Sequence, residues 1–281
     1  MTWATLVVSQ PPLRIELLGS FAMRVLFYWI PALIFTAFDR VMPTLSSDLK
    51  VRRGGDIRSR DIFWIGMNGL LNQLFATAIQ GGIQFTYSQL LMRKTSVFHI
   101  GITPPLPLSI IKDILLILTI REVITYVVHR YILHNSRRFS QLSRFHNMHH
   151  QFAKYPVFAL KGQYYHYIDY FLIQFCPLYL PAYLLRVHLL TFFLTLAFVS
   201  LESALTYSGY DIFWRPLGGA VRRIDRHHRP GGDRMDFGIW GILDWCCGTS
   251  GGDSRSEKGG AMNVNRGVSK EFNRQRWRSK K

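Results

Sequence analysis

The residues of this chain that are best suited to chemistry are its histidines. The chain has ten of them, and seven lie in three short groups: His129 and His134, then His146, His149 and His150, then His227 and His228. Imidazole is a good ligand for iron, copper and zinc alike. The grouping therefore predicts a bound transition metal.

Spacing within the groups adds to this prediction. His146, His149 and His150 stand at i, i+3 and i+4, which places them on one face if the segment is helical. His129 and His134 are five residues apart, a poor match for one face of a regular helix. We expect the helix to end or distort between them, or the two residues to serve different metals. Either arrangement is compatible with a dimetal centre, and no HExxH metalloprotease motif is present.

Long apolar segments must position these histidines. Residues 62–92 carry no formal charge and exceed the roughly 20 residues that span a bilayer. Residues 17–38 form a second long apolar segment, which carries Arg24, and residues 105–128 form a third that charged residues interrupt. Residues 170–207 are long enough for a hairpin of two short or tilted helices. The sequence predicts an all-α, polytopic membrane protein with about four transmembrane helices, because a charge-free run like 62–92 is unusual in a soluble core.

Basic residues indicate the topology. The segment 39–61 is rich in Arg and Lys, whereas the segment after Met92 has few, so we expect 39–61 to be cytosolic. Counting the spans forward returns all three histidine groups to that same side. The fold expected is a helical bundle with a cytosolic, histidine-rich cap that carries a dimetal site. We expect no cleavable signal peptide, because the first apolar segment lacks a cleavage site after a short core.

The net charge of +17 needs a partner. Residues 251–281 are predicted to be a disordered basic tail, which can bind anionic lipid headgroups. Nucleic acid is a poorer explanation, because no basic recognition module is evident. The three cysteines offer no disulfide framework and are consistent with a reducing, cytosolic face.

An ordered series of motifs resembles the membrane fatty acid hydroxylase and sterol desaturase superfamily, over roughly residues 120–250. Members of that superfamily carry an HxxxH or HxxxxH box followed by two HxxHH boxes. The matching residues here are Glu122, Tyr126, His129, Arg130 and His134, then HNMHH at 146–150, then His166 and Asp169 in a segment similar to AHPxE, then Ser208–Tyr210, similar to HSGY without its histidine, and finally Asp244 and Gly248–Thr249.

Two residues depart from the superfamily pattern. Ile224 stands where the third box has its first histidine, and Tyr207 stands where HSGY has its own. Isoleucine cannot coordinate a metal. The site is expected to recruit Asp225, Asp233 or Asp236, to keep an open coordination position, or to hold one metal poorly.

The resemblance implies a non-haem diiron centre with two iron ions, O2 as co-substrate and an external electron donor such as cytochrome b5 or a reductase. The implied metal ligands are histidines: His129, His134, His146, His149, His150, His166, His227 and His228. Carboxylates are expected to orient these imidazoles, and the acidic residues suited to that role are Glu122, Asp169, Asp225 and Asp244.

The function expected is that of an endoplasmic-reticulum membrane oxygenase. It would hydroxylate or desaturate an apolar substrate: a sterol, a fatty acyl chain, or a terpenoid or polyketide secondary metabolite. Residues 1–104 are predicted to be an N-terminal transmembrane region, 105–250 a fatty acid hydroxylase-like catalytic domain, and 251–281 the tail. Two alternatives stay open. One is a metal-depleted protein that binds lipid or scaffolds a pathway enzyme, and the other is a zinc isomerase or hydrolase that needs no O2.

Overall fold

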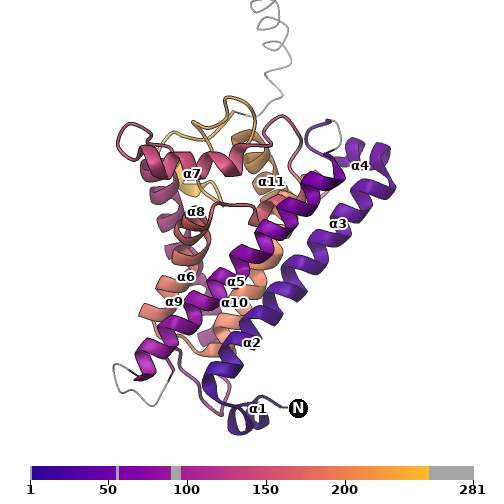
Figure 1. Cartoon of the computed structure of the whole chain (residues 1–281). Helices are drawn as coiled ribbons and strands as arrows, with labels where there is room; N and C mark the ends of the chain where they lie inside the picture. Colours follow the sequence, from indigo (N-terminus) through magenta and orange to yellow (C-terminus); the bar gives the residue numbers. More distant parts are fainter. Residues whose placement is uncertain (1, 55–56, 90–95, 253–281) are drawn as a thin grey trace, which may run out of the picture. The chain divides into compact units, whose positions relative to one another are not determined.

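The computed structural model describes the chain except for residues 1, 55–56, 90–95 and 253–281 (Figure 1). The described residues form helices joined by loops, with two isolated bridges, Lys50–Tyr210 and His99–His188, and no β-strand. The all-α prediction is confirmed. The predicted basic tail lies outside the described residues from residue 253 onward.

The N-terminal part is a pair of long helical segments. The short helices α1 (Trp3–Ser9) and α4 (Pro43–Leu49) flank the first segment, in which α2 (Pro12–Arg24), a π-helical turn (Val25–Trp29) and α3 (Ile30–Val41) run on continuously. The second segment is α5 (Ser59–Gln89). Proline stands at the start of α2, where its fixed φ suits the first helical turn and its missing N–H costs nothing.

The remaining helices carry the predicted motifs. They are α6 (Pro107–Val128) with a π-helical turn (His129–Leu133), α7 (Ser140–His150), a 3-10 turn (Ala159–Gln163), α8 (Tyr167–Tyr170) with a π-helical turn (Phe171–Phe175), α9 (Cys176–Leu184), α10 (Leu189–Tyr207), α11 (Arg215–His227) and α12 (Ile242–Cys246). The predicted hairpin within 170–207 is present as α9 and α10, which the short segment 185–188 joins.

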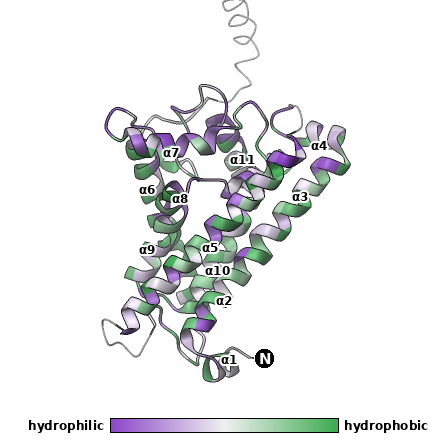
Figure 2. Ribbon diagram, in the orientation of Figure 1, coloured by the Kyte–Doolittle hydropathy of each residue, from purple (hydrophilic) through white to green (hydrophobic). Residues whose placement is uncertain are grey.

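Three helical segments are long and apolar enough to cross a membrane: 12–41, 59–89 and 189–207. Figure 2 shows the predominantly hydrophobic colour of α2, α3, α9 and α10 against the hydrophilic α7 and α11. Helix α6 is not among these candidate membrane spans, because it contains too many charged residues. Two of its charges are matched inside the protein, where Arg121 donates to Glu202 of α10 at 2.7 Å and Glu122 accepts backbone N–H groups. A fourth span stays a prediction.

One apolar core joins the N-terminal helices to the helices that carry the motifs. It contains Ile15 of α2 and Ala76 of α5 together with Ile117, Tyr179 and Phe192 of α6, α9 and α10. The compact unit formed by this packing comprises residues 1–249. The core therefore contains residues from both sides of the predicted boundary at residue 104, and the N-terminal helices help to build the scaffold of the histidine-bearing region.

The three histidine groups and the described residues of the basic segment, 39–54 and 57–61, lie at the same end of the bundle, with α4, α7 and α11 (Figure 1). Direct bonds tie them together: Arg52 donates to Asp225 of α11 at 3.1 Å and to the Ala153 carbonyl at 2.9 Å. The histidine groups thus lie at the same end of the bundle as Arg52. That this end faces the cytosol, and that all three groups lie on one side of the membrane, stay predictions.

Candidate metal centre

A wide helical turn brings the first two histidines together. The His134 N–H donates to the His129 carbonyl at 3.0 Å, an i→i+5 bond that defines the π-helical turn after α6. The Nε2 atoms of the two rings come within 3.2 Å of each other. The expected distortion of the helix is confirmed, and its effect is to direct both residues to one point.

Helix α7 supplies the next two rings. His146 and His150 are one turn apart, and their Nε2 atoms lie 3.1 Å from each other. The Nε2 atom of His146 also lies 3.1 Å from that of His129 and 3.2 Å from that of His134.

His227, at the end of α11, completes the group. One nitrogen from each of five rings lies within 4.8 Å of all the others: His129, His134, His146, His150 and His227. We call this set the five-imidazole cluster.

Hydrogen bonds on the outer nitrogens fix how three of these rings are protonated. The Nδ1 atom of His129 is 2.8 Å from the Phe237 carbonyl, that of His227 is 2.6 Å from the Met235 carbonyl, and that of His146 is 2.9 Å from Asp169 Oδ2. Carbonyl and carboxylate oxygens only accept, so each Nδ1 must carry the hydrogen. The three Nε2 atoms therefore present lone pairs to the interior of the cluster, and His227 Nε2 is buried with no hydrogen-bond partner.

The loop that supplies two of these carbonyls is itself held by carboxylates. Asp244 accepts from the N–H groups of Phe237 (2.8 Å) and Gly238 (2.7 Å), and Glu122 accepts from Ile239 at 3.0 Å. Asp236, between the two carbonyl-bearing residues, has a left-handed φ of 56°, a conformation that Asp tolerates better than most residues. The turn at Asp236 allows Met235 and Phe237 both to bond rings of the cluster.

Burial favours the neutral form of four rings of the cluster, those of His129, His134, His150 and His227. It lowers the pKa of His129 and His150 well below the ordinary value, and the neighbouring imidazoles lower it further. The same causes lower the pKa of His134 to about 2, whereas burial is the main cause that lowers the pKa of His227 to about 4. Neutral imidazole is the form that binds metal.

His149 and His228 lie on the other side of the cluster, with Tyr207 between them. The Tyr207 hydroxyl oxygen is 2.9 Å from His149 Nε2 and 3.4 Å from His228 Nε2. His149 is tied to the Tyr164 carbonyl through Nδ1 at 2.7 Å and stacks on Tyr165 with ring centroids 3.8 Å apart. We call His149, His228 and Tyr207 the tyrosine group.

Other predicted ligands are placed outside the cluster. His166 stacks on Phe145 at 4.0 Å, and its Nδ1 accepts from the Ile168 N–H at the start of α8. Asp225 bonds Arg52 and Arg229, Asp236 bonds Arg226, and Asp233 is exposed. Of the acids expected to orient imidazoles, Asp169 does so directly. Glu122 and Asp244 act through the loop 237–240, and Asp225 contacts arginines instead.

Lys161 is a member of the site that the motifs did not indicate. It lies in the 3-10 turn, is 1% exposed, and its charge contributes to lowering the pKa of His149 and of His228. Burial lowers the pKa of Lys161 itself to about 7. A lysine flanked by apolar residues was the signal available in the sequence. The sequence alone does not indicate that this lysine is buried.

A cavity of about 670 Å³, including its mouth, opens beside the histidines. It is lined by three rings of the cluster (His129, His146 and His227), by the tyrosine group, by the Arg121–Glu202 ion pair, and by apolar residues that include Ile173, Ile224 and Ile239. An apolar molecule that entered this cavity would lie next to the imidazole nitrogens.

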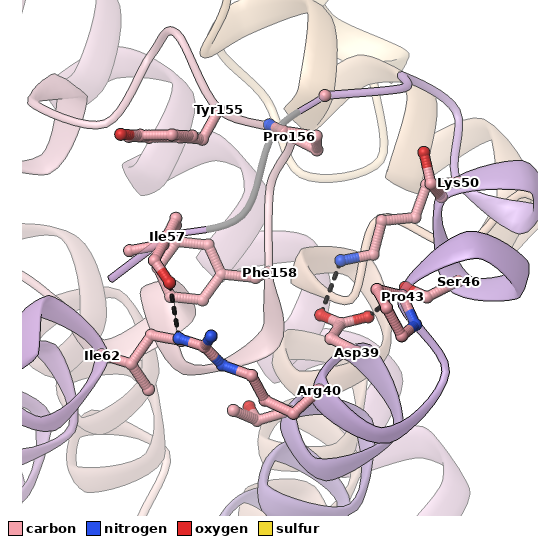
Figure 3. Close-up of a pocket in the computed structure, with 13 residues that line it drawn as sticks. Asp39, Arg40, Pro43, Ser46, Lys50, Ile57, Ile62, Tyr155, Pro156 and Phe158 are labelled. Carbon is pink, nitrogen blue, oxygen red and sulfur yellow. Dashed lines mark hydrogen bonds and ion pairs between the residues drawn. The ribbon is translucent and has the colours of Figure 1, made fainter. Parts of the chain in front are cut away.

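A second hollow, of about 540 Å³, contains none of the histidines among its lining residues (Figure 3). Its Lys50 is paired with Asp39 at 2.6 Å, and Arg40 donates to the Ile57 carbonyl. Asp39 also accepts from Tyr210, which belongs to the predicted Ser208–Tyr210 motif. These charges are therefore internally matched and anchor that motif to α3.

Comparisons with known proteins agree with this geometry. Residues 114–249 match the model of the family described as fatty acid hydroxylase. Among curated proteins, the chain is similar to methylsterol monooxygenase 1-2 of Arabidopsis thaliana (26% identity; 54% of this chain, 51% of the relative) and to methylsterol monooxygenase 1-1 of the same plant (28%; 56% and 54%).

The matched region spans about half the length of these relatives. No solved structure matches the chain. The family match begins within α6 and ends at Thr249, so it includes all three histidine groups and every residue that orients them. The resemblance predicted from the histidine boxes is confirmed by the match of residues 114–249 to the fatty acid hydroxylase family model.

Proposed function

We propose that this protein is an O2-dependent membrane oxygenase that hydroxylates or desaturates a lipid-like substrate at a histidine-ligated iron site. One observation carries the proposal: five imidazole nitrogens lie within 4.8 Å of one another beside an apolar-lined cavity. The curated relatives, by name methylsterol monooxygenases, support a sterol or a similar molecule as the substrate.

The five-imidazole cluster fits a metal ion. An ion that bonds imidazole nitrogens at about 2.1 Å separates ligands at right angles by about 3.0 Å, close to the 3.1–3.2 Å between neighbouring Nε2 atoms here. On three rings of the cluster, those of His129, His146 and His227, the Nε2 atom carries no hydrogen. Without a cation these lone pairs would repel one another. Zinc is compatible with the same ligands. Iron is the proposed ion because a lipid C–H bond is beyond the reach of side-chain acids and bases, and iron supplies the redox chemistry that activates O2.

The chain's own residues position the substrate and exclude water. The cavity walls come from α6, α10, α11 and the loop 237–239, and its apolar residues suit an alkyl or ring system. Arg121 and Glu202 are bonded to each other at 2.7 Å. They offer hydrogen bonds to a hydroxyl or carboxyl group at one end of the substrate. Asp169 and the two loop carbonyls hold the imidazoles in place during the reaction.

Hydroxylation of one C–H bond consumes one O2, two electrons and two protons and releases one water. The electrons must come from outside the described residues, so we propose cytochrome b5 or a reductase as donor. The basic segment 39–61 beside the histidines supports a cytosolic site in the endoplasmic-reticulum membrane. In that position the site is accessible both to an electron donor in the cytosol and to a substrate in the bilayer.

Microsomes from cells that express the chain test this proposal. They would receive NADPH, ¹⁸O2 and a panel of methylsterols, fatty acyl chains and terpenoids. We expect one class to give a product that carries ¹⁸O or a new double bond. His146→Ala should abolish it at equal protein level, whereas His99→Ala, which alters an exposed histidine outside the cluster, should retain it.

Two outcomes would contradict the proposal. Turnover that persists without O2 would favour a zinc isomerase or hydrolase. Lipid that binds unchanged by His146→Ala, with no product from any class, would favour the metal-depleted binding or scaffolding protein. The intact five-imidazole cluster argues against the latter, since a chain that has lost its metal has no need to keep five converging imidazoles.

A further inference from the structure

We infer that this chain holds a single metal ion, in the five-imidazole cluster, and that the Tyr207 hydroxyl occupies the place of a second ion between His149 and His228. The inference rests on the proposed function, which assigns a metal to the cluster, and it revises the expected number of ions from two to one.

The Tyr207 hydroxyl contacts the Nε2 atoms of both histidines of the tyrosine group, while His228 Nδ1 is buried without a hydrogen-bond partner. His149 gives its Nδ1 hydrogen to the Tyr164 carbonyl at 2.7 Å, so its Nε2 can only accept, and the Tyr207 hydroxyl lies 2.9 Å away to donate. That bond uses the lone pair that a metal would need. The hydrogen of the Tyr165 hydroxyl, 3.3 Å away, and the Nε2 hydrogen of His228, 3.4 Å away, can both be donated to the Tyr207 oxygen.

This network continues beyond the histidines. Gln174 donates to the Tyr165 hydroxyl at 3.1 Å, and Tyr165 stacks on His149. The series from Gln174 through Tyr165, Tyr207 and His149 to a backbone carbonyl thus runs in one direction with every step filled. Such a network rigidifies a buried site when each member is satisfied.

The five-imidazole cluster has the opposite character. The Nε2 atoms of His129, His134, His146 and His150 face one another at 3.1–3.2 Å, and His227 Nε2 lies close by with no hydrogen-bond partner. On His129, His146 and His227 the ring hydrogen is already donated outward. No hydrogen is left on these three rings to bridge the facing lone pairs. A cation satisfies all of them at once, which is why we place the ion there.

Adjacent side chains of a helix point in different directions, which explains why the histidines of α7 and α11 divide between the five-imidazole cluster and the tyrosine group. His149 and His150 are neighbours on α7, and His227 and His228 are neighbours at the end of α11. Successive residues of a helix point about 100° apart. One member of each pair therefore enters the five-imidazole cluster and the other enters the tyrosine group. Ile224, one turn before His228, lines the same cavity with an apolar side chain that cannot replace the missing ligand.

Charge also disfavours a second ion. Lys161 is fully buried and close enough to both histidines of the tyrosine group for its charge to act on them. Asp225, the acidic residue close enough to influence Lys161, is already bonded to Arg52 and Arg229. Even a partial positive charge on Lys161 opposes a second divalent cation in a buried site of low dielectric.

Iron content tests the inference directly. The full chain, purified in detergent, is loaded anaerobically with Fe(II), passed through a desalting column and analysed for iron and protein. We expect one iron per chain. His227→Ala should lower this to near zero. His149→Ala and Tyr207→Phe should leave it at one, because neither residue is a ligand in this arrangement. Size-exclusion chromatography confirms that each variant is folded.

Two results would overturn the inference: two irons per chain in the natural protein, or a loss of iron in Tyr207→Phe, which would make Tyr207 a metal ligand. Electron paramagnetic resonance after oxidation gives a second readout. An isolated ferric ion gives a signal that accounts for all the iron, whereas a coupled pair is silent. One iron per chain together with no oxygenated product would refute the proposed function and leave the inference standing, so the two failures are distinguishable.

Discussion

Asp169→Asn should weaken metal binding without removing a ligand. The carboxylate is fully buried and its Oδ2 lies 2.9 Å from His146 Nδ1. Asparagine keeps the shape and can still accept this hydrogen bond through its carbonyl oxygen, but it removes the negative charge. The substitution therefore isolates the electrostatic support that Asp169 gives to the imidazole.

The magnitude follows from that loss of charge. A hydrogen bond to a charged group contributes about 1.5–3 kcal/mol, against about 0.5–1.5 kcal/mol for a neutral pair, a difference of about 1–1.5 kcal/mol. Since about 1.4 kcal/mol is a factor of ten in affinity, the Kd for Fe(II) should rise about tenfold. This is at the lower end of the 10–100-fold range typical of groups that support a metal ligand.

The assay is competition between the purified protein and a chromogenic chelator for Fe(II) or Co(II). Asp225→Asn is the matched control, because Asp225 is as deeply buried but bonds Arg52 and Arg229 instead of a histidine. An unchanged Kd in Asp169→Asn, or an equal rise in Asp225→Asn, would refute the assignment of Asp169 to metal support.

Three further predictions concern pH, the loop and the cavity. In the metal-free protein, burial lowers the pKa of His227 to about 4, so the unfolded chain binds the proton first as pH falls. His227 alone should lower the free energy of unfolding by about 1.4 kcal/mol per pH unit between about 6.5 and 4, and the other buried imidazoles with lowered pKa add to this loss; equal Tm values at pH 7 and pH 5 would contradict this. A Cβ at Gly238 would lie 2.6 Å from Glu122 Oε1 and 2.9 Å from Asp244 Oδ2, so Gly238→Ala should displace the loop and lower metal affinity in the chelator assay. Gly82→Ala, where nothing lies within 4 Å, should not. Ile173→Trp should fill the cavity and reduce product formation several-fold at unchanged metal content, whereas Leu194→Trp at an exposed position should alter neither.

The sequence allowed much of the scaffold and the histidine set to be predicted. Apolar runs located the long helices, and the five-residue spacing of His129 and His134 indicated a distorted helix. The i, i+4 spacing of His146 and His150 suited one site. These features follow from helical periodicity, which depends only on position along the chain.

What could not be predicted depends on packing between distant segments. His149 satisfies the same spacing rule as His150, yet it bonds Tyr207 and lies outside the five-imidazole cluster. His166 matched a motif but stacks on Phe145. The carbonyls of Met235 and Phe237 orient two rings. Every residue carries such a carbonyl, so no sequence pattern distinguishes them.

The π-helical turn at His129–Leu133 bears on how such boxes tolerate changes in length. Residues four apart on an α-helix share a face, whereas residues five apart diverge by about 140°. The wide turn absorbs the additional residue, and both rings still reach one point. A box with the shorter HxxxH spacing reaches the same geometry on a regular helix. A one-residue insertion between two ligands can thus be compensated within a single turn of backbone, so the spacing of a box can drift during evolution while the centre that it builds is preserved.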